Sequence, residues 1–254
     1  IVCGDLDELP VEAIVGSAFG EWPAAAENGL ALPAAPDEAA AGRRVVIVDR
    51  PAAPQSEIRV GHVGTSRRTD DFHALSVMNA LLGGLFNSRL NMLLREERGY
   101  TYGVNSTFDM RRAAGPFGVR CAVESDVTAP AVADIMAELG RIGEDPVGDD
   151  ELDAARDYLI GVFPLRFETS AQVAGALSGL VVHGLPDDEL DRYRPAVAAV
   201  TADDVRAAAE AHIDAEAASI VVVGDASVCE TELREAGYGE VEVIQDEGFG
   251  PADE

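Results

Sequence analysis

Residues 83–104, GGLFNSRLNMLLREERGYTYGV, are the stretch from which the fold can be inferred. The two glycines at its start disfavour a helix interior, so a helix over residues 70–82 is expected to end there. Asn87 or Ser88 can cap a second helix, which reaches about Arg98 because the next residue is a glycine. The aromatic and β-branched residues that follow favour a strand. The stretch therefore predicts a helix, a break, a second helix and a strand.

The rest of the chain predicts strands in its first half and mainly helices in its second. Ile58, Val60 and His62 alternate with other residues, which indicates a half-buried strand over 57–65. Further strands are expected over 44–49, 100–109, 116–124 and 219–223, with 110–115 as a hairpin loop. Helical spacing with caps at Thr128, Asp149, Thr169 and Thr201 predicts helices over 127–142, 149–163, 169–182 and 202–213. This order is typical of an α+β fold, a mixed and largely antiparallel sheet that helices cover on one face.

The first and last parts of the sequence resemble each other. Residues 1–21 and 221–240 both contain an apolar run, a Gly-Asp pair, a helix-like stretch and an aromatic residue followed by Gly-Glu. A duplication explains this match, although Gly-Asp turns after strands are also common by themselves. We therefore interpret residues 1–28 as the closing strand and helix of a preceding homologous domain, and 29–42 as a linker. Residues 43–242 then form the domain proper, and the acidic residues 243–254 are expected to be a disordered tail.

The composition is that of an acidic globular protein. A net charge of -27 disfavours nucleic acid and anionic membranes as partners, because both would repel the chain. Residues 43–120 are locally basic, with 12 arginines against 7 acids, and are the natural place to contact a carboxylate or a carbonyl. Cys3, Cys121 and Cys229 form no C-x-x-C pair and are interpreted as buried free thiols, which fits a cytoplasmic location.

No hydrolytic metal motif occurs in the sequence. A zinc peptidase needs H-E-x-x-H or its inversion H-x-x-E-H, which place two histidines and a carboxylate on one helix face. The histidines, His62, His73, His183 and His212, are scattered without acidic residues at ligand spacing. A phosphate-binding G-x-x-x-x-G-K-[ST] loop and a G-x-S-x-G elbow are also missing. The chain is therefore expected to hold no metal and no cofactor of its own.

The stretch 83–104 resembles the hallmark of the insulinase (pitrilysin) family of zinc peptidases, in the second, zinc-free half of these proteins. There a Gly-rich break leads to Ser-Arg-Leu, Leu-Arg-Glu and Arg-Gly-x-x-Tyr, and this sequence has SRL at 88–90, LRE at 94–96 and RGYTY at 98–102. VTADDV at 200–205 and VVVGD at 221–225 resemble the way in which domains of the family close. The resemblance covers about residues 43–242 and implies an α+β domain.

The resemblance also implies how the activity is shared between two halves. One half holds zinc on an H-x-x-E-H helix, and the two halves close around a peptide. The other half supplies an arginine and a tyrosine, here Arg95 and Tyr102, which are expected to grip the substrate backbone and stabilise the oxyanion of the tetrahedral intermediate. Arg98 and Asn105 are further candidate substrate-binding residues, since the strand from Tyr102 could pair with an extended peptide. The expected partners are a peptide and a zinc-binding half, on the same polypeptide or a separate subunit, and the fragment alone is expected to be inactive.

The same residues allow other interpretations. Arg95 can be an exposed helix arginine paired with a nearby carboxylate, and Tyr102 a core or rim aromatic. The chain can also be a catalytically inactive homologue that acts as a scaffold or partner-binding domain, or a stand-alone hydrolase with an unrecognised site. An inner face exposed by the absence of the other half could also lead two copies to form a homodimer.

Overall fold

A six-stranded sheet in the order β3-β4-β2-β5-β1-β6 forms the centre of the protein, in a computed structural model that describes residues 1–23 and 43–246. The strands are β1 (Val45–Asp49), β2 (Gln55–Val63), β3 (Val104–Phe108), β4 (Pro116–Glu124), β5 (Ser219–Gly224) and β6 (Val241–Gln245). The helices are α1 (Val11–Phe19), α2 (Phe72–Asn79), α3 (Arg89–Asn91), α4 (Thr128–Glu144), α5 (Asp149–Val162), α6 (Ser170–His183), α7 (Glu189–Ala199), α8 (Ala202–His212) and α9 (Ala226–Glu235). Two π-helical turns, Ala80–Gly84 and Met92–Glu97, extend α2 and α3, and 3₁₀ turns precede α4 and follow α5 at Ser125–Val127 and Phe163–Phe167.

The sheet is mixed, which confirms the predicted α+β fold. β2 pairs antiparallel with β4 and β5, and β3 pairs antiparallel with β4. β1 lies between β5 and β6 and is parallel to both. A parallel neighbour needs a crossover, and α9 supplies it between β5 and β6 by packing against β1 and β6.

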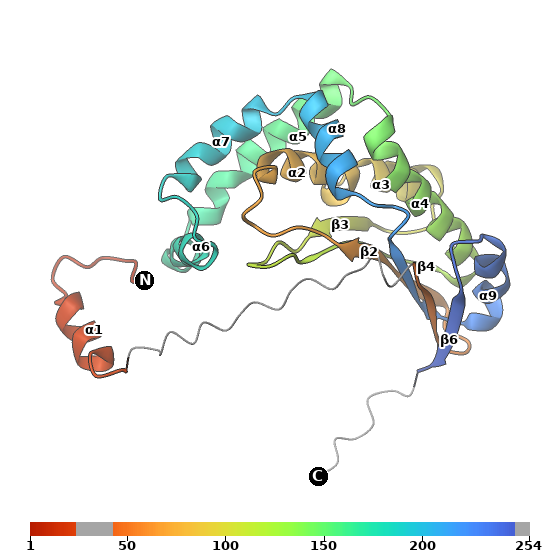
Figure 1. Ribbon diagram of the computed structural model, residues 1–254, viewed down its shortest axis with the longest axis horizontal. Coiled ribbons are helices and arrows are strands. Elements are labelled where there is room, and N and C mark those ends of the chain that lie inside the picture. The colour runs from red at the N-terminus through yellow and green to blue at the C-terminus, as the bar shows by residue number, and fades with distance from the viewer. Residues whose placement is uncertain (24–42, 247–254) are drawn as a thin grey trace, which may run out of the picture.

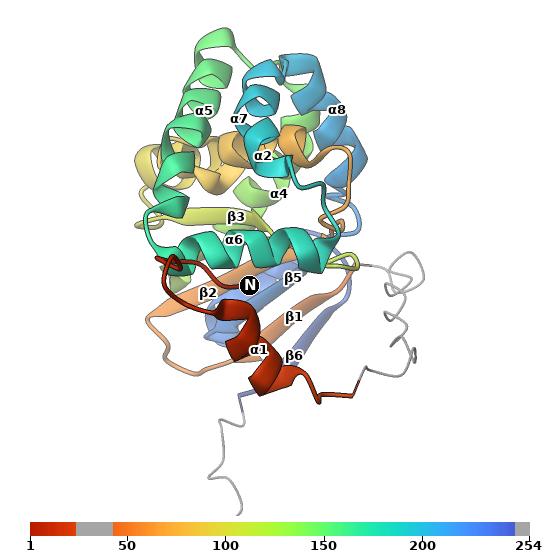
Figure 2. The ribbon, with the colours of Figure 1, turned by 90° about the vertical axis from the view of Figure 1, so that its left-hand side faces the viewer.

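In the part of the chain that the structure describes, the helices that pack on the sheet lie over one of its faces (Figure 1). α4 packs on β2 and β4, and α8 packs on α2 and α4, in the layer above the sheet that Figure 2 shows from the side. The alternation predicted for β2 is confirmed, because Ile58, Val60 and His62 are buried under this layer while Glu57 and Arg59 are exposed. We call the face that carries Glu57 and Arg59 the open face.

Of the four helix caps predicted after residue 125, two are confirmed. Thr169 and Thr201 each accept a hydrogen bond from the backbone N–H three residues later, in capping boxes that begin α6 and α8. The caps predicted at Thr128 and Asp149 are wrong, since both residues lie inside the first turn of their helices. The Thr128 hydroxyl instead lies 2.7 Å from the Ser56 hydroxyl, and this contact joins α4 to β2.

Two segments of the domain differ from the prediction. α7 was not predicted, and it contains Pro195, a residue that disfavours helix interiors; Tyr193 and Val197, one turn apart, are buried and anchor it. β3 begins at Val104 rather than at position 100. Residues 101–103 form a turn instead, because the Thr101 hydroxyl donates to the Gly103 carbonyl and accepts from its N–H.

The domain boundary predicted after residue 242 is wrong. Residues 243–245 belong to β6, where they pair with β1, rather than to an acidic tail. The remainder of that tail, residues 247–254, and the predicted linker over 29–42 lie outside the described residues.

The N-terminal segment contains the predicted helix but no strand. Residues 1–5 pair with nothing in the sheet, and α1 begins only at Val11. None of the residues of α1 is buried, and Figure 1 shows it apart from the sheet. The assignment of residues 1–28 to a preceding homologous domain stays a prediction.

Two of the three cysteines agree with the prediction of buried free thiols. Cys121 and Cys229 are buried and unpaired, and burial raises the pKa of their thiols to about 12 and about 11. Cys3 is free but only partly buried. Within residues 1–23 and 43–246, no helix has both the length and the apolar character needed to cross a bilayer.

Candidate functional site

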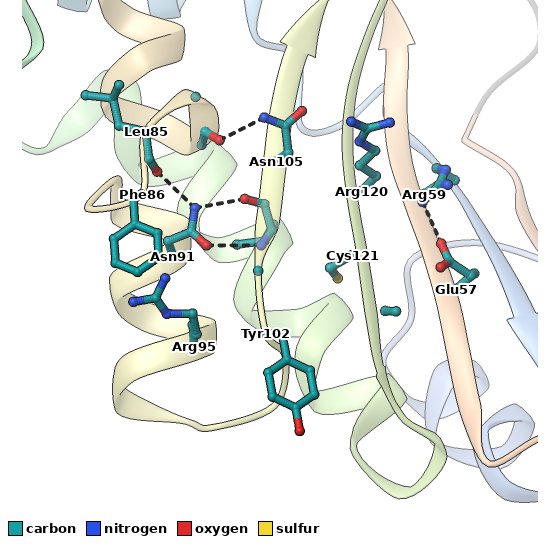
Figure 3. Close-up of a pocket in the computed structure, with 15 residues that line it drawn as sticks. Glu57, Arg59, Leu85, Phe86, Asn91, Arg95, Tyr102, Asn105, Arg120 and Cys121 are labelled. Carbon is teal, nitrogen blue, oxygen red and sulfur yellow. Dashed lines mark hydrogen bonds and ion pairs between the residues drawn. The ribbon is translucent and has the colours of Figure 1, made fainter. Parts of the chain in front are cut away.

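An open pocket of about 560 Å³ lies at the β3 edge of the sheet, where the helix layer meets the open face. The turn between α2 and α3 and the segment before β3 form one wall, and β4 and β2 form the floor (Figure 3). Its lining includes Glu57, Arg59, Phe86, Asn91, Arg95, Tyr102, Asn105 and Arg120. Both residues predicted to be catalytic therefore lie in the wall of one pocket.

Asn91 holds the two sides of this wall together. Its Nδ2 donates to the carbonyls of Leu85 at 3.0 Å and Val104 at 2.8 Å, and its Oδ1 accepts from the Val104 N–H at 3.1 Å. These bonds join the α2–α3 turn and the start of β3, as the dashed lines in Figure 3 show. The side chain is 5% exposed, so the bonds are shielded from water. The predictions did not include Asn91, although a single amide inside an apolar helix run is a signal for a buried polar anchor.

Arg95 projects from the helical turn after α3 and stacks on Phe86. The centre of its guanidinium lies 3.4 Å from the centroid of the Phe86 ring, and its Nε donates to Glu96 at 2.8 Å. The Arg95 side chain is 17% exposed, while Phe86 is 75% exposed. The first alternative for Arg95, a pairing with a nearby carboxylate, is thus present, but the side chain is held against a ring in the pocket rather than extended into solvent.

Tyr102 stands at the mouth of the pocket. It is 97% exposed, and the turn at 101–103 sets its position just before β3. Gly99, with a φ of +68°, makes the bend that carries the chain from the helix to this turn. Figure 3 shows the polar ends of Arg95 and Tyr102 pointing away from each other. The structure brings the two residues to one pocket without direct contact between their polar groups.

The other two predicted substrate-binding residues separate. Asn105 lines the pocket from β3, with its Nδ2 3.4 Å from the Gly83 carbonyl. Arg98 does not line it, because its guanidinium makes two bonds to Asp134 of α4, at 2.9 and 3.2 Å.

Arg59 and Arg120 form the floor of the pocket and were not singled out from the sequence. They lie directly opposite each other on β2 and β4, and Asn105 lies opposite Arg120 on β3. The basic bias of residues 43–120 was the sequence signal for them. Cys121 of β4 also lines the pocket, but burial raises the pKa of its thiol to about 12, which leaves almost no thiolate at neutral pH, so it is unsuited to act as a nucleophile.

The described residues do not fit a zinc ion. No group of three His, Cys, Asp or Glu side chains converges within residues 1–23 and 43–246. The histidines are spread over the molecule, and two of them bond within the domain: His62 accepts from the Asp214 N–H at 3.2 Å, and His212 lies 2.6 Å from Asp71.

Comparison with known proteins assigns the chain to a family. The fold is an α+β domain with a mixed sheet and an open pocket beside β3, and no group of metal ligands lies among its described residues. The sequence model described as "Peptidase M16 inactive domain" matches residues 1–159, which is more than half of the chain, and the chain belongs to this family. The resemblance to the zinc-free half of pitrilysin-type peptidases is thereby confirmed.

Related sequences and structures agree with this family. The chain is 30% identical over 213 residues to an uncharacterized zinc protease of Streptomyces coelicolor, covering 81% of this chain and 45% of that protein. It is 25% identical over 206 residues to an uncharacterized zinc protease of Mycobacterium tuberculosis, covering 81% and 47%. The chain thus spans about half the length of these relatives.

Two solved structures illustrate the shared fold. The crystal structure of a peptidase M16 inactive domain from Pseudomonas fluorescens superposes with a TM-score of 0.67 at 26% identity, covering 72% of this chain and 44% of that one. A protease from Helicobacter pylori superposes with a TM-score of 0.76 at 19% identity, covering 87% and 54%, which shows a common fold.

Proposed function

We propose that this domain is the substrate-gripping half of a zinc endopeptidase whose metal is held by another half, on the same polypeptide or on a second subunit. The observation that carries the proposal is that Arg95 and Tyr102 line one open pocket beside the last strand of the sheet, β3. In this proposal the domain contributes donors to a reaction whose nucleophile is activated elsewhere, so the domain alone does not hydrolyse peptides.

The chemistry expected of the two residues is stabilisation of negative charge. When a peptide carbonyl becomes tetrahedral its oxygen becomes an anion, and fixed donors at that point lower the barrier by roughly 3–4 kcal/mol each in other hydrolases. Arg95 is always charged and is oriented by the Phe86 ring, and the Tyr102 hydroxyl is a neutral donor. Because Tyr102 is 97% exposed, its working environment is completed only when a substrate or the other half covers it.

The outer edge of β3 does not favour the strand addition that the sequence suggested. The Val104 N–H and carbonyl bond to the Asn91 side chain, and the Ser106 carbonyl accepts from the Asn79 amide at 3.1 Å, so these outward backbone groups already have partners. Asn105 lines the pocket from the same strand, and its amide can both donate to and accept from a peptide. In this proposal β3 therefore contacts the peptide through the Asn105 side chain.

The proposal is tested by hydrolysis with both halves present. Arg95→Ala and Tyr102→Phe should each lower kcat/KM by about a hundredfold, with the larger part in kcat, because the donors act mainly in the transition state. Arg194→Gln, which removes an exposed arginine of α7 that has no ion pair among the described residues, is the charge-matched control and should leave kcat/KM unchanged. Full activity in both Arg95→Ala and Tyr102→Phe would refute the proposal.

A scaffold or partner-binding domain without a catalytic part is the second candidate. It is favoured by the pairing of Arg95 with Glu96 and by the divergent directions of Arg95 and Tyr102. Hydrolysis by the zinc-bearing half at the same rate with and without this domain would support this candidate over the first.

A further inference from the structure

Two arginines stand side by side on the open face without enough negative charge to balance them. Arg59 of β2 and Arg120 of β4 are directly opposite each other in an antiparallel pair. Like charges in this position destabilise a sheet. Glu57 neutralises Arg59 in part, with an oxygen 2.9 Å from its Nη1, whereas Arg120 makes no ion pair among the described residues. The chain has a net charge of -27, so carboxylates are abundant. Arg120 nevertheless contributes no ion pair to the stability of the described fold.

The pair is also placed to meet a ligand. Figure 3 shows Asn105, Arg120 and Arg59 in a row across three strands, beside the wall that carries Arg95 and Tyr102. Neighbouring strands are about 5 Å apart, so the two guanidiniums can reach one carboxylate from both sides. Both arginines are part of the 560 Å³ pocket of the proposed grip.

A second pocket continues from the arginines along the open face. It measures about 450 Å³, shares Arg59 and Arg120 with the first, and is lined further on by apolar residues such as Val63, Pro116 and Val221. Gly61 and Gly118, paired across β2 and β4, leave its floor without side chains. A Cβ at Gly61 would come within 2.3 Å of the Phe117 carbonyl oxygen, so this position is restricted to glycine. The arginines therefore lie in the middle of a continuous track, between the predicted catalytic residues and a bare strip of sheet.

We infer that Arg59 and Arg120 together bind a carboxylate of the peptide substrate, so that the assembled enzyme prefers peptides with Asp or Glu at one position away from the cleaved bond. This inference rests on the proposed function, because it places the peptide in the same pocket. The arginines act by positioning the peptide and do not touch the reacting carbonyl. The carboxylate can come from an acidic side chain or from the C-terminus of a peptide.

Paired peptides test the inference with both halves of the enzyme present. In a fluorogenic peptide of neutral sequence, a single Glu is moved from position to position, and each peptide is compared with its Gln counterpart. Wild type should cleave the Glu peptide with a kcat/KM about tenfold higher at one position, and Arg120→Gln should reduce this ratio to about one. Peptides with a free and an amidated C-terminus distinguish the two sources of the carboxylate.

Two further variants sharpen the expectation. Glu57→Gln removes the internal competitor for Arg59 and should raise the Glu/Gln ratio, whereas Arg120→Glu should make the enzyme prefer a Lys peptide over the Gln peptide. Arg194→Gln should keep the wild-type ratio. Thermal unfolding of each variant checks that the domain is folded.

Two results would overturn the inference: no Glu preference of wild type at any position with either C-terminus, or a Glu/Gln ratio that is unchanged in Arg120→Gln. If that unchanged ratio comes with an equal loss of kcat/KM for both peptides, the arginines instead contact the zinc-bearing half. The readout is the ratio of kcat/KM for the Glu and Gln peptides within one variant. It therefore does not depend on how much Arg95 and Tyr102 contribute to hydrolysis. If the two-half protein does not hydrolyse the peptides, fluorescence anisotropy measures their dissociation constants instead. The ratio of these constants for the Glu and Gln peptides then replaces the ratio of kcat/KM.

Discussion

The two faces of the sheet are built from the same strands but differ in burial and in charge. On the covered face Ile58, Val60 and Val119 are at most 1% exposed. On the open face the residues next to them in sequence are the charged Arg59 and Arg120, with glycines at 61 and 118. Because successive strand residues point to opposite sides, a single run of sequence supplies both the core and the floor of the pocket.

The covered face therefore stabilises the fold, and the open face is available for a ligand. Fully burying an aliphatic side chain contributes about 1.5–3 kcal/mol, so the covered face carries most of the free energy of folding. Opposed arginines and bare glycines contribute little or destabilise. If the comparison is sound, substitutions on the covered face change stability, and those on the open face change peptide binding or hydrolysis.

The largest expected effect comes from two adjacent residues of β2. Ile58→Ala should lower the free energy of unfolding by about 2–5 kcal/mol, because it leaves a cavity under the helix layer. Arg59→Ala, one position later, should change it by no more than about 0.5 kcal/mol. Chemical denaturation of the two variants measures both values. Equal losses would contradict the separation of the two faces.

Asn91 is expected to link the two properties. Asn91→Ala leaves the Val104 N–H and the Leu85 carbonyl without their partner in a buried place, which should lower the free energy of unfolding by about 1–3 kcal/mol. It should also lower kcat/KM of the two-half enzyme, since the wall that carries Arg95 and Tyr102 loses its tie to β3. A loss of stability with unchanged kinetics would show that the wall keeps its shape without Asn91.

Substitution of Phe86 is expected to have a smaller effect, mainly on kcat/KM. Phe86→Ala removes the ring on which Arg95 stacks, an interaction that contributes about 0.5–1 kcal/mol at exposed sites, so kcat/KM should fall about threefold. The free energy of unfolding should fall by no more than about the same 0.5–1 kcal/mol, because Phe86 is 75% exposed and buries little apolar surface. Phe86→Leu keeps the bulk without the aromatic face and should behave like Phe86→Ala. Wild-type kinetics in both variants would exclude an orienting role for the ring.

The smallest expected effect is a gain. Arg120→Thr replaces one of two opposed charges with a residue that favours strands, so the free energy of unfolding should rise by about 0.2–1 kcal/mol. Denaturation at low and at high salt measures it, and the gain should shrink at high salt as the repulsion is screened. A loss of stability would mean that Arg120 has a favourable partner within the fold.

The regular elements could be predicted from the sequence, and the exceptions have physical causes. Side-chain periodicity identified β2, β4 and α4, because each buries one face. β6 was missed, since its pairing with β1 depends on the backbone and only Val241 is fully buried. α7 was missed because Pro195 disfavours a helix, and the burial of Tyr193 that compensates for it depends on tertiary contacts.

The candidate site was predictable only in part for a similar reason. Sequence motifs indicated Arg95 and Tyr102, and the structure places both in one pocket. The stacking of Phe86 on Arg95 depends on how the turn after Gly84 folds back, and the opposition of Arg59 and Arg120 depends on strand register. The first relation cannot be read from the sequence because it depends on the fold of a turn. The second cannot be read from it because Arg59 and Arg120 lie in strands that are distant in sequence.

The affinity of the two-half enzyme for a phosphinic peptide, whose tetrahedral oxygens mimic the intermediate, tests most directly whether this domain stabilises charge for the other half. We predict that Arg95→Ala and Tyr102→Phe raise the inhibition constant by about a hundredfold, in parallel with the loss of kcat/KM, and change the affinity for an uncleaved substrate peptide much less. An inhibition constant that stays at the wild-type value in both variants would show that Arg95 and Tyr102 do not stabilise the tetrahedral intermediate.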